Sequence, residues 1–183
     1  IEESVPVAEP IITPIEEIKE EPIQEPINTT PMATNNIIHN TTSMITNNQK
    51  IVAFVGTSKN GTSFLVNNTA ELLSQTGINT AILDLTKNKN SYYIYTENEE
   101  KLRNIAYDSI DNLRRGNANG IEVHKNLTVY TMLPGEEEGI EDYSNILNTL
   151  TQNYSLVILD CDFETNYNYF AQAHEIYLVQ SLD

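Results

Sequence analysis

The sequence predicts an α/β domain with a doubly wound, mostly parallel sheet that lies between two layers of helices. Two observations predict it. Short apolar segments of strand length alternate along the chain with segments whose apolar residues recur at helical spacing. Several strand-like segments are continuous apolar runs, such as Leu156 to Leu159, which is typical of parallel strands covered on both faces. The chain stops just after one such strand, so we expect the sheet to continue beyond residue 183.

The composition changes sharply near residue 50. Six of the seven prolines lie between Pro6 and Pro31, whereas all seven glycines lie at or beyond Gly56. The first 28 residues carry eight glutamates and a single lysine, and an uncharged tract rich in Asn and Thr follows. Such a segment cannot bury enough apolar surface to offset its ordering entropy. We therefore expect residues 1–49 to be a disordered linker and residues 50–183 to be the folded domain.

The overall charge argues against anionic partners. The chain has 26 acidic and 10 basic side chains, which gives a formal net charge of −16. A surface this acidic repels nucleic acid and anionic membrane, so we expect protein partners and no nucleic-acid binding. The longest apolar runs are of strand length, so no transmembrane segment is expected. The single cysteine, Cys161, fits a reducing compartment. We expect a cytoplasmic protein, which only its partners would recruit to a membrane or a cell pole.

The folded part begins with a strand, a loop and a helix. Ile51 to Val55 is an apolar strand, and the loop from Gly56 to Ser63 follows it directly. A single apolar stripe predicts a helix over 63–76, and Gly77 stands where a left-handed C-terminal cap belongs. A second buried strand then ends at Asp84.

The remaining elements continue this alternation. After a polar segment with three tyrosines, 87–96, Asn98 is predicted to cap a helix that ends at two arginines and Gly116. Asp162 is predicted to cap a short helix later in the chain. The further elements are a strand over 126–133, a helix over 141–151, a strand over 155–160, the short helix over 165–173 and a strand over 176–180.

The loop after the first strand has the spacing of a phosphate-binding loop, G-x-x-x-x-G-K-[ST]. Gly56 and Gly61 lie at the required separation, and Ser63 occupies the position of the magnesium-binding hydroxyl. In such a loop, backbone N–H groups and a helix N-terminus point at anionic oxygens. Thr62 stands where the lysine belongs, so that positive charge is missing. The residues expected to contact phosphate are Gly56, Lys59, Asn60, Gly61, Thr62 and Ser63. The alternative is a strand-to-helix turn that needs its glycines for backbone geometry alone.

Two aspartates end buried strands at the carboxyl end of the predicted sheet, where the loop also lies. These residues are Asp84 and Asp160, and ligands of parallel α/β sheets bind outside the carboxyl ends of the strands. We expect Asp160 and Ser63 to hold Mg²⁺ if nucleotide binds. For Asp84, the turn chemistry of a strand end is nearly as good an explanation as a functional role. No metal-ligand spacing connects the three histidines, His39, His124 and His174, with Cys161.

These residues together resemble the ParA/MinD family of partitioning and positioning ATPases, which belong to the SIMIBI class of phosphate-loop proteins. The resemblance rests on the loop and helix ending in Gln75-Thr76-Gly77, on 126–135, and on the strand from Tyr154 to Asp160. It implies a three-layer phosphate-loop fold that binds ATP or ADP with Mg²⁺. It also implies a water-positioning, catalytic role for Asp84 and a magnesium role for Asp160.

The chain departs from the family pattern at both loop lysines, whose positions hold Thr57 and Thr62. The family's adenine-binding segments would lie beyond residue 183. The divergent loop and the preceding linker are most similar to the TadZ/CpaE-type pilus-assembly branch, or to related proteins of mobile elements.

Two functions follow from this resemblance. The first is a degenerate ATPase that acts as a positioning or assembly platform for protein partners, with weak or absent hydrolysis. The second is an active, partner-regulated Mg-ATPase that dimerises on ATP binding. The missing lysine favours the first, because that charge would stabilise the phosphoryl oxygens in the transition state. Tyr92, Tyr93 and Tyr95 are expected to pack in the core, with a partner-binding face as the alternative.

Overall fold

The computed structural model describes residues 49–57, 59–97, 99–136, 139–164 and 166–180. The first strand begins at Lys50, and almost all of the linker predicted over 1–49 lies outside the described residues. The strands are β1 (Lys50–Gly56), β2 (Thr80–Asp84), β3 (Ile121–His124), β4 (Leu127–Tyr130), β5 (Leu156–Asp162) and β6 (Glu175–Val179). The helices are α2 (Thr62–Gln75), α3 (Asn90–Thr96), α4 (Glu100–Arg114), α5 (Tyr143–Asn153) and α6 (Tyr167–Phe170).

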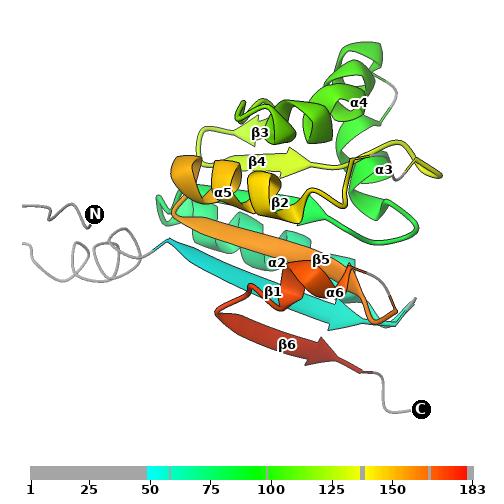
Figure 1. The fold of residues 1–183 in the computed structure, drawn as a ribbon, viewed down its shortest axis with the longest axis vertical. Helices are drawn as coiled ribbons and strands as arrows, with labels where there is room; N and C mark the ends of the chain where they lie inside the picture. Colours follow the sequence, from blue (N-terminus) through cyan, green and yellow to red (C-terminus); the bar gives the residue numbers. More distant parts are fainter. Residues whose placement is uncertain (1–48, 58, 98, 137–138, 165, 181–183) are drawn as a thin grey trace, which may run out of the picture. The chain divides into compact units, whose positions relative to one another are not determined.

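The six strands form one sheet in the order β3-β4-β2-β5-β1-β6. All neighbouring strands run parallel except β3 and β4, which pair antiparallel at one edge. In Figure 1, α5 and α6 lie on one face of the sheet and α2 lies behind it. The prediction of an α/β fold with a mostly parallel sheet flanked by helices is confirmed.

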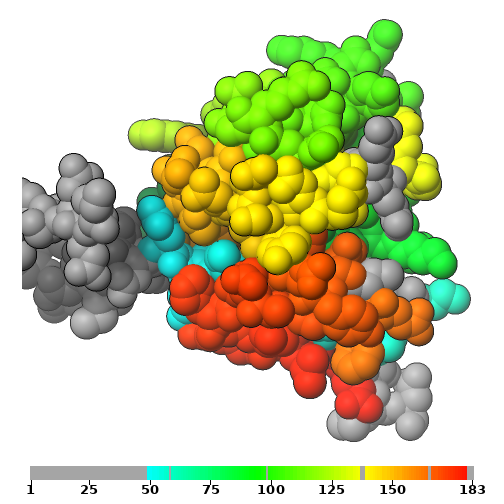
Figure 2. All heavy atoms as spheres, viewed as in Figure 1, coloured from blue at the N-terminus to red at the C-terminus, as the bar shows by residue number. Residues whose placement is uncertain are grey.

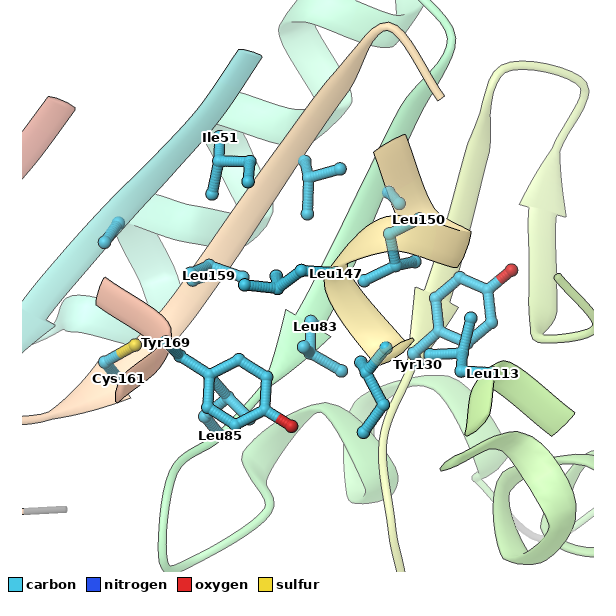
Figure 3. Packing of buried hydrophobic residues seen from close by; sticks show 14 of the residues in the cluster. Ile51, Leu83, Leu85, Leu113, Tyr130, Leu147, Leu150, Leu159, Cys161 and Tyr169 are labelled. Atoms are coloured by element: carbon cyan, nitrogen blue, oxygen red, sulfur yellow. The ribbon is translucent and has the colours of Figure 1, made fainter. Parts of the chain in front are cut away.

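Two clusters of buried apolar side chains hold the helices to the two faces of the sheet. The first cluster joins strand residues such as Leu83 and Leu159 to α5, and Figure 3 shows these side chains together with Leu147 and Leu150. The second cluster joins Val66 and other residues of α2 to the opposite face, and α4 contributes to both clusters. Each fully buried leucine contributes about 1.5–3 kcal/mol by leaving water. In Figure 2, α5 and the segment around α6 cover most of the central strands on this face.

The helix α2 ends as the sequence predicts, at a left-handed glycine. Gly77 has a φ of +92°, and its N–H donates to the carbonyl oxygen of Ser74 at 2.9 Å. An L-side chain is strained in this conformation, so a glycine is favoured at the cap. The cap lets the chain turn back into β2, which is buried at all five positions.

Several predicted elements differ from the structure. The strand β3 was not predicted, because only Ile121 of its four residues is buried and no apolar pattern marks it. The polar segment at 87–96 forms the helix α3, and the strand predicted over 126–133 is limited to β4. The helix predicted over 165–173 spans only four residues, because the chain turns at Ala171 to enter β6.

Two predicted helix caps also differ. The cap position of α4 is Glu99, and Asn98 lies outside the described residues. The cap position of α6 is Asn166, whereas Asp162 is the last residue of β5. The prediction that Asp162 caps a helix is therefore wrong: its carboxylate accepts a hydrogen bond from the backbone N–H of Lys87 at 2.5 Å.

Candidate functional site

The loop that follows β1 presents the N-terminus of α2 at the carboxyl ends of the parallel strands. Gly61 precedes the helix with a φ of +79°, a left-handed conformation that favours glycine. Among the described residues, no side chain caps the first turn of α2 and no acidic residue lies in it. The partial positive charge of the helix end is therefore not offset by a cap or an acidic side chain of the first turn, and such a helix end suits an anion.

Thr62, at the position of the missing lysine, packs against the end of β1. Only 8% of its surface is exposed, and its hydroxyl is buried without a hydrogen-bond partner among the described residues. A Cβ atom at Gly56 would lie 2.0 Å from this hydroxyl oxygen and 3.1 Å from the carbonyl oxygen of Val179. Gly56 is thus required because the first turn of α2 approaches the strand closely.

A cavity of about 280 Å³ opens at the N-terminus of α2. This volume is at the low end for ligand sites and suits a few phosphate groups better than a whole nucleotide. Four of the six residues predicted to contact phosphate line it, whereas Gly56 and Asn60 line a neighbouring cavity of about 480 Å³. The first cavity is lined by Thr57, Lys59, Gly61, Thr62, Ser63, Phe64, Thr86, Asn88, Asn90 and Asp162.

Asp160 lies fully buried near the predicted magnesium hydroxyl of Ser63. Neither of its carboxylate oxygens has a hydrogen-bond partner of normal geometry among the described residues. Burial raises the pKa of Asp160 to about 7, and the charge of Asp84 adds to this shift. The nearby Ser63 hydroxyl lowers this pKa, although that hydroxyl oxygen accepts a hydrogen bond from Asn90 Nδ2 at 3.1 Å. Two unpaired buried oxygens beside a hydroxyl suit a cation ligand set.

Asp84 lies beside Asp160 in the neighbouring strand, but its oxygens are occupied. Oδ1 accepts hydrogen bonds from the N–H and the hydroxyl of Thr86, at 3.0 and 2.6 Å. Oδ2 accepts from the N–H of Ser91 at 2.9 Å and from the hydroxyl of Thr131 at 3.3 Å. These four bonds favour the role of a turn-organising carboxylate, and the water-positioning role stays a prediction.

The segment between β2 and α3 closes one side of the cavity. Asn90 contacts Ser63, the N–H of Lys87 contacts Asp162, and Asn166 Nδ2 donates to the carbonyl oxygen of Leu85 at 3.0 Å. Sequence reasoning missed this segment because its residues are polar and show no period. It also missed Lys89, whose surface is only 1% exposed. A lysine within a polar segment gives no local signal of burial.

The described histidines and the cysteine lie in separate places. Among the described residues, no group of three His, Cys, Asp or Glu side chains is placed to hold a metal ion. His174 Nδ1 accepts a hydrogen bond from the N–H of Ile51 at 3.0 Å, and His124 contacts Glu71 on α2. Cys161 is buried within the first cluster, and burial raises its pKa. His39 lies outside the described residues.

The three tyrosines of α3 divide between core and surface. Tyr92 and Tyr95 pack against the second cluster, while Tyr93 is 62% exposed. The Tyr95 hydroxyl donates to Asn67 Oδ1 at 2.8 Å, and burial, with the charge of Glu71, raises the pKa of Tyr95 to about 12. Core packing is therefore confirmed for Tyr92 and Tyr95 and wrong for Tyr93, and the partner-binding face stays a prediction.

No protein-family model and no curated protein sequence matches this chain. Within the part of the chain that the structure describes, no helix is long and apolar enough to cross a membrane.

Proposed function

We propose that the domain binds the phosphates of a nucleotide, ATP or ADP with Mg²⁺, and serves as a platform for protein partners with weak or absent hydrolysis. The observation that carries the proposal is the uncapped N-terminus of α2, which faces a cavity next to a buried carboxylate with unpaired oxygens. The helix end and the backbone N–H groups of the loop suit phosphate, and Ser63 with Asp160 suits Mg²⁺. The ancestry we infer is that of a ParA/MinD-like phosphate-loop protein.

Weak hydrolysis follows from the charge available at the loop. The positions of the two family lysines hold Thr57 and Thr62. Lys59 is an exposed residue with a left-handed backbone that lines the cavity, so its long side chain is the loop's one candidate to reach phosphate. An exposed lysine loses most of its electrostatic effect to water, and transition-state stabilisation requires a preorganised charge.

The alternative function is an active Mg-ATPase that dimerises on ATP binding and is regulated by a partner. It is favoured by the presence of both magnesium positions, Ser63 and Asp160, near one another. A dimer would also cover Phe64 and Tyr93, which are 70% and 62% exposed. The two functions differ in turnover and in oligomeric state.

Calorimetric titration with Mg-ADP and Mg-ATP tests the proposal. We expect saturable binding that weakens when EDTA removes Mg²⁺, together with ATP turnover close to the buffer blank. Turnover at the rate of an ordinary ATPase, with a dimer formed only in ATP, would favour the alternative. Absence of heat with both nucleotides, together with no shift in the thermal unfolding midpoint, would contradict nucleotide binding altogether.

A further inference from the structure

Lys89 is a buried lysine that lies outside the phosphate loop, in the segment between β2 and α3. Its surface is 1% exposed, which places it among the largest fully buried side chains of the described residues. Lysine is almost never fully buried unless its charge is compensated. Its backbone is left-handed, with φ 49° and ψ 51°, a conformation that costs a residue with a side chain free energy. The fold therefore holds Lys89 in a backbone conformation that costs free energy, and it buries a side chain that is usually charged and solvated.

The backbone around Lys89 is fixed by hydrogen bonds on both sides. The Lys89 N–H donates to the carbonyl oxygen of Thr86 at 3.4 Å, and its own carbonyl accepts from Tyr92 at 3.0 Å. Asp84 binds residues on either side of it, Thr86 and Ser91. The side chain of Lys89 thus starts from a short segment that is fastened to the end of β2.

Two fully buried carboxylates lie near the carboxyl ends of neighbouring strands: Asp84 is the last residue of β2, and Asp160 precedes the last two residues of β5. Asp84 of β2 lies opposite Asp160 of β5 in the parallel register, and both are 0% exposed. The charge of Lys89 lowers the pKa of Asp160 and of Cys161, so its ammonium lies within electrostatic reach of the end of β5. Two adjacent buried carboxylates repel each other, and a buried cation between the strand ends reduces that cost.

We propose that Lys89 is the buried counter-charge of the Asp84–Asp160 pair and a positioning residue that keeps Asp160 in place beside the phosphate loop. In this role Lys89 would keep in place the carboxylate proposed to hold Mg²⁺ when phosphate binds. The pairing itself concerns the protein without ligand, and only its use in phosphate binding rests on the proposed function.

A double-mutant cycle on the protein in EDTA tests the pairing. Lys89→Met removes the charge, and we expect a fall of about 10 °C or more in the midpoint of thermal unfolding, since breaking a buried pair is strongly destabilising. In an Asp160→Asn background, the same change should lower the midpoint by about half as much or less, because the uncompensated carboxylate is gone. Lys89→Arg keeps a cation and should recover most of the midpoint.

Lys87→Met is the matched control, because Lys87 lies two residues away and is exposed. It removes the same charge, and we expect no measurable shift. If Lys89→Met alone yields no folded protein, a cooperative transition in the Lys89→Met/Asp160→Asn variant supports the pairing, and its absence overturns it. An equal cost of Lys89→Met in both backgrounds overturns it as well.

The same variants separate this inference from the proposed function. Calorimetry with Mg-ADP on the unmodified protein is independent of the cycle. If no nucleotide binds and the cycle shows coupling, the proposed function fails and the counter-charge stands. If nucleotide binds and the cycle is additive, the counter-charge fails and the proposed function stands.

Discussion

At the scale of single residues, the site is defined by what each polar atom contacts. Asp84 and Asp160 are neighbours in the sheet and equally buried, yet Asp84 accepts four hydrogen bonds whereas Asp160 accepts none among the described residues. Satisfied buried carboxylates stabilise a fold, and unsatisfied ones cost free energy. The contrast separates a carboxylate whose oxygens organise a turn from one whose oxygens have no hydrogen-bond partner among the described residues.

The buried carboxylate of Asp160 predicts a pH-dependent gain in stability when it is neutralised. Its pKa is raised from 3.8 to about 7, so the folded state binds this proton more tightly than the unfolded state does. The stability contributed by the protonated form is complete below pH 3.8 and is lost as the pH rises through 7. Asp160→Asn should therefore raise the free energy of unfolding at pH 8 by about 1–4 kcal/mol in EDTA, with little effect near pH 4.

Urea unfolding of both proteins at several pH values measures this difference. The exposed Asp108 is the control position, where replacement by Asn should change stability by about 0.5 kcal/mol or less at any pH. A loss of stability in Asp160→Asn at pH 8 would mean that the carboxylate is compensated more fully than its surroundings indicate.

Restoring the loop lysine predicts a gain in nucleotide affinity. Thr62 lines the cavity, so a lysine at 62 would start from the cavity wall. A new charge-assisted hydrogen bond to phosphate should improve binding of Mg-ADP by about 1.5–3 kcal/mol in Thr62→Lys. Asn68→Lys is the control, because it adds the same charge to an exposed position of α2. Calorimetry that finds equal affinity in both variants would rule out missing charge as the defect of the loop.

At the scale of elements, the site combines a helix end with two strand ends. The parallel pairing brings Gly56, Asp84 and Asp160 together at the carboxyl end of the sheet, because β5 lies between β1 and β2. The helix α2 starts at the same end of the sheet, and it is the helix end that we propose binds phosphate. No single element carries the site, which is why the order of the strands matters to the function.

The glycine before α2 offers a test of the helix end as the phosphate site. No atom lies within 4 Å of a Cβ placed on Gly61, so a larger side chain there would occupy open space in front of the loop. Gly61→Val should abolish binding of Mg-ADP, measured by calorimetry, because its methyl groups fill the approach to the N–H groups.

Gly116 provides a matched control for the strain that this change introduces. It has a φ of +83°, and no atom lies within 4 Å of a Cβ placed on it. Unlike Gly61, it follows α4 and does not belong to the loop at 56–63. Gly116→Val should destabilise the protein to a similar extent and leave affinity unchanged. Unchanged affinity in Gly61→Val would place any nucleotide elsewhere.

The sequence predicts those elements whose signal is local. The apolar runs of β1 and β5 and the glycine spacing of the loop lie within a few residues, and the structure contains each of these elements. By contrast, β3 has one buried residue and is a strand only because β4 pairs with it. Lys89 is buried although Lys87, Asn88 and Asn90 around it are exposed, and no local sequence pattern indicates this burial.

At the scale of the whole domain, a sheet with two covered faces concentrates stability in its central strands. Leu159 of β5 is fully buried, whereas Leu178 of the edge strand β6 is 71% exposed. The first cluster, shown in Figure 3, places Leu159 near α5, and its loss would leave a cavity between the sheet and that helix.

Truncating leucine to alanine at each of these two positions measures the difference in stability between the central and the edge strand. Leu159→Ala should lower the free energy of unfolding by about 2–5 kcal/mol, since the surrounding residues relax only partly into the cavity. Leu178→Ala should change it by about 0.5 kcal/mol or less, because an exposed leucine loses little on truncation. Urea denaturation of the chain of residues 1–183, followed by circular dichroism, gives both values. A cost at Leu178 equal to that at Leu159 would mean that β6 is packed against a further part of the protein in solution.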